Sequence, residues 1–117
     1  MRLGRIVAGV GLPFLMATSV LAQELTVVEF ARRAENEERF LLRIEGAAEG
    51  LQVANIQMER EGKTKLYCTS GSLLLTSDQL RVILVRYAEK NPVKGTWPAG
   101  MYGVALLDAL AEVFPCP

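Results

Sequence analysis

The sequence contains no histidine and only two cysteines, Cys68 and Cys116. Histidine is the side chain most often used as a general base near neutral pH and is a frequent zinc ligand, so its absence excludes many catalytic mechanisms. Two cysteines without histidine are too few for a structural zinc site. We therefore expect neither a metal site nor a metal-dependent activity.

The chain also lacks an excess of charge of either sign. Its 13 Lys and Arg residues balance its 13 Asp and Glu residues. No positive excess exists to neutralise a phosphate backbone, so nucleic acid is not expected as a partner. A length of 117 residues with 50% hydrophobic residues is typical of one globular domain.

Residues 1–22 have the layout of a secretory signal peptide. Arg2 and Arg5 precede an uncharged apolar stretch over residues 6–21. A small residue, Ala22, stands before the polar Gln23, so we expect cleavage between them and an exported domain over residues 23–117 with no membrane anchor. The alternative is an uncleaved anchor, for which the apolar stretch is short. Removal of the two leader arginines leaves 11 basic and 13 acidic residues, a net charge of −2.

An exported chain reaches an oxidising compartment, where paired cysteines normally form disulfides. We therefore predict a disulfide between Cys68 and Cys116, which encloses the 47 residues from 69 to 115. Such a closure stabilises the fold by about 4 kcal/mol in the chain-entropy model. The alternative is two free buried thiols. A redox enzyme is not expected, because neither cysteine belongs to a C-x-x-C motif.

Two helical segments are predicted in the first half of the domain. Thr26-Val27-Val28-Glu29 is a capping-box pattern that predicts a short helix over residues 27–34. A longer helix is predicted over residues 37–61, ended by Gly62, because apolar residues recur at spacings of three and four. These residues are Phe40, Ile44, Ala47, Leu51, Ala54 and Met58.

Three residues inside the long segment need an explanation. Gly46 and Gly50 each cost about 1 kcal/mol against Ala in a helix interior. Close packing by a neighbouring helix would explain them, and a locally weak or kinked helix is the alternative. Asn55 is expected to be solvated, together with its neighbour Gln57.

Two more helices are predicted in the second half. Thr76 or Ser77 can cap the third, whose stripe is Leu80, Ile83, Leu84 and Tyr87, and Asn91-Pro92 ends it. Residues 92–98 are expected to form a loop, with Pro98 in the first turn of the last helix. The apolar face of that helix is Gly103, Leu106, Leu107, Leu110, Val113 and Phe114. The expected fold is thus an all-α domain of four helices around one core.

No catalytic constellation is recognisable. Glu35, Glu37 and Glu38 alternate with arginines at helical spacings, which is typical of solvated ion pairs. Gly95, Gly100 and Gly103 do not form a phosphate-binding motif after a strand. We therefore expect a protein without enzymatic activity and without a cofactor. An enzyme that uses only Tyr, Ser or carboxylates is the remaining alternative.

The second half of the chain carries an ordered series of short motifs that resembles the Rap/Tai-type immunity proteins of type VI secretion. The motifs are Tyr67-Cys68, Leu75-Thr76-Ser77-Asp78-Gln79-Leu80, Tyr87, Asn91-Pro92, the segment Ala105 to Leu110, and Phe114-Pro115-Cys116. The glycine-containing segment over residues 45–51 also resembles the second helix of that family. The resemblance covers residues 40 to 116. Many relatives have a second cysteine pair, which is absent here around Arg33 and Leu41.

The resemblance implies a periplasmic helical protein, a possible homodimer, that neutralises a peptidoglycan-cleaving amidase by placing a loop over its catalytic cleft. The motifs mark structural residues, so contact residues are a separate hypothesis. We place them at Lys94, Thr96 and Trp97, although Trp97 is also suited to covering the core. Replacing all three with Ala is expected to weaken partner binding more than tenfold. The alternative function is a periplasmic helical chaperone or envelope-binding protein.

Overall fold

The computed structural model describes residues 25–70 and 74–117. The predicted signal peptide and its cleavage site between Ala22 and Gln23 lie outside the described residues and stay a prediction. The described part contains five α-helices and one 3₁₀-helix. These are α2 (Val27–Arg33), α3 (Glu38–Arg60), α4 (Ser77–Lys90), α5 (Pro92–Gly95), η1 (Ala99–Met101) and α6 (Tyr102–Val113).

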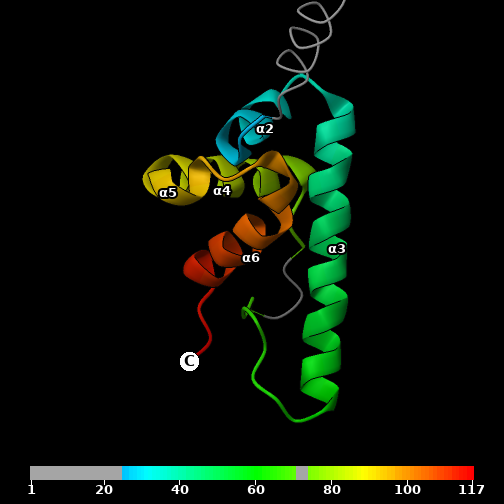
Figure 1. Ribbon diagram of the computed structural model, residues 1–117. Coiled ribbons are helices and arrows are strands. Elements are labelled where there is room, and N and C mark those ends of the chain that lie inside the picture. The colour runs from blue at the N-terminus through cyan, green and yellow to red at the C-terminus, as the bar shows by residue number, and fades with distance from the viewer. Residues whose placement is uncertain (1–24, 71–73) are drawn as a thin grey trace, which may run out of the picture.

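The long helix α3 stands beside α2, α4 and α6, while α5 lies on the side of the domain away from α3 (Figure 1). Helix α2 lies near the first turns of α3, while α4 and α6 pack against α3 and against each other. After α3 the chain turns back, and residues 61–70 return beside the lower half of that helix (Figure 1). The all-α fold is confirmed, and residues far apart in the sequence meet beside α3.

Capping boxes begin two of the helices. At α2 the Glu29 amide donates to Thr26 Oγ1 (3.3 Å) and the Thr26 amide donates to Glu29 Oε1 (2.9 Å), as predicted. At α4 the cap is Thr76 and not Ser77, and the amide of Gln79 donates to Thr76 Oγ1 (3.1 Å). The predicted bounds of α2 and α3 therefore agree with the structure to within one residue at each end.

Gly62 ends α3, as predicted. Its φ of 71° lies in the left-handed region, which glycine adopts without steric cost. The Lys63 amide donates to the Met58 carbonyl (2.8 Å) and the Gly62 amide donates to the Glu59 carbonyl (3.1 Å), which together form a Schellman motif. This motif turns the chain back toward the other helices.

One hydrophobic core joins the four longer helices. Its largest fully buried side chains come from α2, α3, α4 and α6, and they are Val27, Ile44, Leu84, Leu106 and Leu110. Phe30 connects two of these helices to α6, because its ring centroid lies 4.8 Å from those of Phe40 and Tyr102. Most residues of the apolar stripes read from the sequence face this core, but the placement of Val113 on the buried face of α6 is wrong, because Val113 is 52% exposed.

The expected loop over residues 92–98 is wrong in its first half, where the short helix α5 forms. Pro92 begins it, a position that suits proline because the first helical amide needs no partner. Gly95 allows α5 to approach α4, since a Cβ at this position would lie 2.4 Å from the Ala88 carbonyl oxygen. Pro98 precedes η1, and the Val27 amide donates to the Trp97 carbonyl (2.8 Å).

The expectation that a neighbouring helix packs closely on Gly46 and Gly50 is wrong within this chain. Both glycines are exposed, and a Cβ at either position meets no atom within 4 Å. The two glycines therefore face outward from the core. Among the described helices, none is long and apolar enough to cross a membrane.

Candidate functional site: a groove beside helix α3

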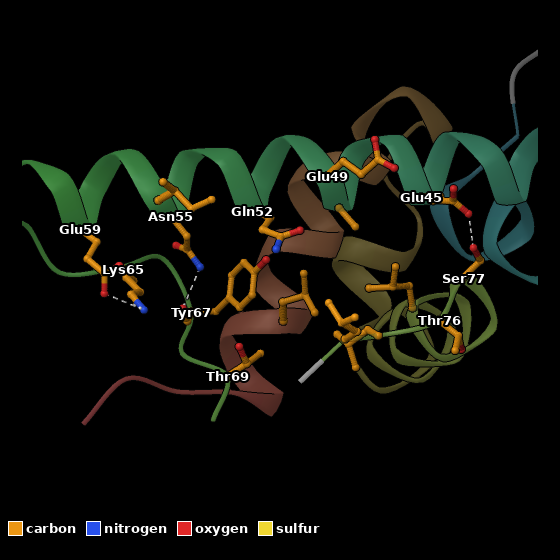
Figure 2. Close-up of a pocket in the computed structure, with 16 residues that line it drawn as sticks. Glu45, Glu49, Gln52, Asn55, Glu59, Lys65, Tyr67, Thr69, Thr76 and Ser77 are labelled. Atoms are coloured by element: carbon orange, nitrogen blue, oxygen red, sulfur yellow. Dashed lines mark hydrogen bonds and ion pairs between the residues drawn. The ribbon is translucent and has the colours of Figure 1, made fainter. Parts of the chain in front are cut away.

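A groove of about 610 Å³ lies between residues 45–59 of α3 and the segments that pack beside them (Figure 2). We call it the α3 groove. The α3 wall consists of Glu45, Ala48, Glu49, Gln52, Asn55, Ile56 and Glu59. The facing wall consists of Lys65, Tyr67, Thr69, Leu74, Leu75, Thr76, Ser77, Leu80 and Leu110. The α3 residues recur at spacings of one, three and four, which places them on one flank of the helix, next to its core face.

Asn55 holds the facing wall in place. It is only 8% exposed, its Nδ2 donates to the Tyr67 carbonyl (2.9 Å), and its Oδ1 accepts from the Leu66 amide (2.7 Å). The expectation that Asn55 is solvated is therefore wrong. A buried amide side chain must find partners, and here both partners are backbone groups of an irregular segment.

The predicted disulfide between Cys68 and Cys116 is confirmed. The two Cα atoms lie 4.9 Å apart, and the Cys68 amide also donates to the Phe114 carbonyl (2.8 Å). The segment that carries Tyr67 is therefore joined to the end of α6 by a covalent bond and to α3 by Asn55. This segment of the facing wall is fixed at both sides, although it belongs to no helix.

Tyr67 occupies the middle of the groove. Figure 2 shows its ring between the two walls, with Gln52 directed toward it from α3. The residue is 8% exposed, and no side-chain hydrogen bond joins its hydroxyl to another described residue, so the hydroxyl is the part that opens to the groove. Burial raises the pKa of the Tyr67 phenol, so at neutral pH it keeps the proton that it can donate.

The charge of the groove is negative. Three lining residues are glutamates and one is a lysine, which gives a net charge of −2. The Lys65 ammonium pairs with Glu59 (3.2 Å), and Glu45 accepts a hydrogen bond from the Ser77 hydroxyl. Glu49 is exposed and makes no ion pair with any described residue. The part of the groove beside Glu49 therefore presents a carboxylate that no described cation neutralises.

The three residues selected from the sequence as partner contacts lie outside the groove. The Lys94 ammonium pairs with Asp108 (2.9 Å) and lies 5.6 Å and 5.8 Å from the ring centroids of Tyr87 and Trp97. Tyr87 and then Asp108 raise the pKa of Lys94 above its ordinary value. The Thr96 hydroxyl lies 3.0 Å from the Pro92 carbonyl oxygen, to which it can donate.

Trp97 is partly buried and packs against the core. Lys94, Thr96 and Trp97 therefore all have contacts within the chain. Their role in binding a partner stays a prediction. The triple alanine variant would not test that role cleanly, because it also removes contacts that stabilise the fold.

Of the three glutamates expected to pair with nearby arginines around the turn between α2 and α3, Glu37 does so, while Glu35 and Glu38 form no ion pair with any described residue. Arg33 pairs with Glu37 across one helical turn (2.6 Å), and Arg39 pairs with the same carboxylate (3.1 Å). Arg32 pairs with Glu89 of α4 (3.0 Å). These pairs lie outside the groove and are exposed, so each contributes little to stability.

The groove offers apolar surface, carboxylates and hydroxyl groups. Within residues 25–70 and 74–117 no group of three His, Cys, Asp or Glu side chains is placed to hold a metal ion. The contact between Ser77 and Glu45 joins the start of α4 to α3. This combination of surfaces suits the recognition of another molecule.

Sequence reasoning missed the groove because its two walls are brought together by long-range contacts. One signal was present: Glu45, Glu49, Gln52 and Glu59 follow helical spacing beside the core stripe. The facing wall carries no periodic pattern. Comparisons of this chain with protein-family models, with curated proteins and with solved structures find no match.

Proposed function

We propose that this chain is an exported binding protein that neutralises a peptidoglycan-cleaving amidase delivered by type VI secretion. Sequence motifs support the proposal, because their types and order resemble the Rap/Tai-type immunity proteins over residues 40 to 116. The all-α fold agrees with what the resemblance implies. In this function the protein binds and covers the amidase, and performs no chemistry of its own.

The observation that carries the proposal is the way in which the motif residues hold one another. Tyr67-Cys68 and Phe114-Pro115-Cys116 lie far apart in the sequence, yet the disulfide and the bond from the Cys68 amide to the Phe114 carbonyl join them. Thr76 caps α4, and the Asn91 amide at the other end of α4 donates to the Tyr87 carbonyl (2.9 Å). Helices α4 and α6 also pack against each other, so the motifs belong to one linked frame.

A rigid frame suits an inhibitor that acts by occlusion. Segments that are already held in their bound conformation lose little conformational entropy when they bind, which raises affinity. Here the irregular segment over residues 65–69 is held by Asn55 and by the disulfide. The proposed location is the periplasm, and the disulfide is compatible with such an oxidising compartment.

A homodimer belongs to the same proposal. A shallow apolar groove of about 450 Å³ between α3 and α6 is the surface at which a second copy would pack, because three of its lining residues are glycines. Gly50, Gly100 and Gly103 would allow helices to approach closely. Light scattering on the oxidised domain over residues 23–117 measures the mass in solution, and a monomer at all concentrations would contradict the dimer.

A pull-down tests the proposed function. The oxidised domain over residues 23–117 is immobilised and exposed to periplasmic extract and, separately, to the product of the neighbouring gene. We expect recovery of one peptidoglycan amidase in a defined ratio, with its activity lost in the complex. Recovery of many unrelated proteins, or of none, would contradict the proposal. The same domain with Cys68→Ala and Cys116→Ala is the control for dependence on the closed frame.

A periplasmic chaperone is the second candidate. It is favoured by three exposed apolar side chains of α3, of which Ile56 also lines the α3 groove. These are Leu42, Val53 and Ile56, which are 56%, 65% and 51% exposed. A chaperone of this kind would suppress the aggregation of several unrelated unfolded proteins at comparable concentrations. Suppression that disappears in a variant with all three changed to Ser would favour this function over immunity.

A further inference from the structure

We propose that the α3 groove binds a cationic segment of the partner protein, with a Lys or Arg side chain directed toward the glutamates of α3. The identity of the partner as an amidase rests on the proposed function. The groove and its preference for a cationic segment do not, because they rest on the shape, charge and hydrogen-bonding groups of this chain.

The size and lining of the groove suit a short stretch of polypeptide. A volume of about 610 Å³ lies within the range of sites that bury most of a small ligand. Ile56 is 51% exposed and Leu74 is 80% exposed, and both line the groove. Lys and Arg side chains have apolar stems that cover such surface while the charged end stays in water.

The negative charge of the groove favours a positively charged occupant. The groove carries three carboxylates and one ammonium group, a net charge of −2. The chain from Gln23 onward has 11 basic and 13 acidic residues, which is also −2. The rest of that chain is therefore balanced, and the groove carries the whole excess. Carboxylates that line a concave surface concentrate their field there, which attracts cations and repels anions.

Tyr67 supplies an independent observation that points to a ligand. Tyr67 is only 8% exposed as a residue, and no side-chain hydrogen bond joins its hydroxyl to another described residue. Because no fully buried side-chain oxygen in the described part of the chain lacks a partner, the hydroxyl is the part of Tyr67 that reaches the open groove. In Figure 2 the hydroxyl points into the groove, and Gln52 approaches it from α3. A backbone carbonyl of a bound segment can accept from the Tyr67 hydroxyl, and Gln52 can donate or accept beside it.

The non-helical part of the facing wall, over residues 65–69, is already fixed before a partner binds. Asn55 binds the backbone of Leu66 and Tyr67, and the disulfide fixes the next residue, Cys68. A partner segment therefore does not need to order this wall when it binds. This saves conformational entropy and favours a specific site over weak adhesion.

A peptide titration followed by NMR tests the groove without the amidase. The oxidised domain over residues 23–117 is titrated with three capped peptides of equal length that alternate leucine with lysine, glutamine or glutamate. We expect the lysine peptide to bind at least tenfold more tightly than the glutamine peptide, with shifts at the amides of Gln52, Ile56 and Tyr67. Equal binding of the glutamate peptide, or shifts confined to other surfaces, would overturn the proposal.

Two variants and a matched control sharpen the titration. Glu49→Lys reverses the charge at the position of the unpaired carboxylate and should weaken binding of the lysine peptide at least tenfold. Tyr67→Phe removes only the hydroxyl and should weaken binding of the lysine peptide about threefold. This corresponds to the loss of one hydrogen bond of about 0.7 kcal/mol. Glu35→Lys makes the same change of charge at an exposed residue outside the groove and should leave the affinity unchanged. Equal effects of Glu49→Lys and Glu35→Lys would overturn the proposal.

The same variants separate this inference from the proposed function. An amidase that is captured equally by the wild type and by Glu49→Lys would leave the immunity function in place and overturn the groove as its contact surface. Binding of the lysine peptide in the groove, with no amidase captured, would support the groove and contradict the immunity function. Loss of amidase capture by Glu49→Lys but not by Glu35→Lys would support both.

Discussion

The two halves of α3 differ in what surrounds them. In the first half Phe40 and Ile44 are buried, at 8% and 0% exposure, and Phe40 packs on the Phe30 ring of α2. In the second half Val53 and Ile56 are 65% and 51% exposed, and the side chain that is buried is polar Asn55. The same helix is therefore held by apolar packing at one end and by hydrogen bonds at the other.

This difference explains how a small domain keeps an open surface without losing its shape. Most helical stability in proteins comes from burial of one apolar face. The second half of α3 buries little, so the wall beside it is fixed instead by Asn55 and by the Cys68–Cys116 disulfide. The apolar side chains of the α3 groove therefore remain exposed to a partner, while the groove keeps its form.

Removal of the disulfide should have the largest effect. The double variant Cys68→Ala with Cys116→Ala opens a loop of 47 residues and should lower the free energy of unfolding by about 4 kcal/mol. Urea denaturation measures the loss, and hydrogen exchange should show the greatest loss of protection beside the second half of α3. Protection lost equally in both halves would contradict the difference between them.

Truncation of the core in the first half should have the next largest effect. Ile44 is fully buried, so Ile44→Ala should lower the free energy of unfolding by about 3 kcal/mol through lost burial and an internal cavity. Val53→Ala on the outward face is the matched control and should change it by no more than about 0.5 kcal/mol. Both values come from urea denaturation. Similar losses in the two variants would show that the second half is packed as tightly as the first.

Loss of the Asn55 side chain should have a smaller and more local effect. Asn55→Ala leaves the Leu66 amide and the Tyr67 carbonyl without their partners and should cost about 2 kcal/mol. Gln57→Ala is the control, because Gln57 is exposed and its bond to Glu61 is at the surface. Hydrogen exchange at Leu66 should accelerate in Asn55→Ala alone. An unchanged rate there would mean that the disulfide is sufficient to hold the wall.

The helices of this fold were predictable because their signals are local. Thr26, Gly62 and Thr76 each act within five residues of their own position, through caps whose pattern is visible in the sequence. The disulfide was predictable for a different reason, since two cysteines allow one pairing. Helix ends and the disulfide can therefore be predicted without knowing which helices pack against each other.

The remaining features depend on contacts between distant residues. Asn55 and Gln57 look alike in the sequence, and only the arrival of the segment over residues 65–69 buries one of them. Gly95 permits the approach of α5 to Ala88, and the approach itself comes from the packing of the whole domain. The α3 groove needs α3, the disulfide-linked segment and α4 together, so no local pattern predicts it.

Substitution of Gly50 should have the smallest effect, with the opposite sign. Gly50 is exposed with no atom within 4 Å of a Cβ, so Gly50→Ala should raise the free energy of unfolding of the monomer by about 1 kcal/mol, through better helix propensity. Gly46→Ala is the matched control, because Gly46 is equally open but does not line the shallow groove beside α6. Urea denaturation and light scattering measure stability and mass.

The two glycines then distinguish a free surface from a dimer interface. If a second copy packs at Gly50, the added methyl group separates the helices, and Gly50→Ala should weaken the dimer while Gly46→Ala leaves it intact. If Gly50 faces water, both variants gain the same stability and neither changes the mass. Equal gains at constant mass would mean that the outward face of α3 carries its glycines for a reason other than contact with a second copy at Gly50.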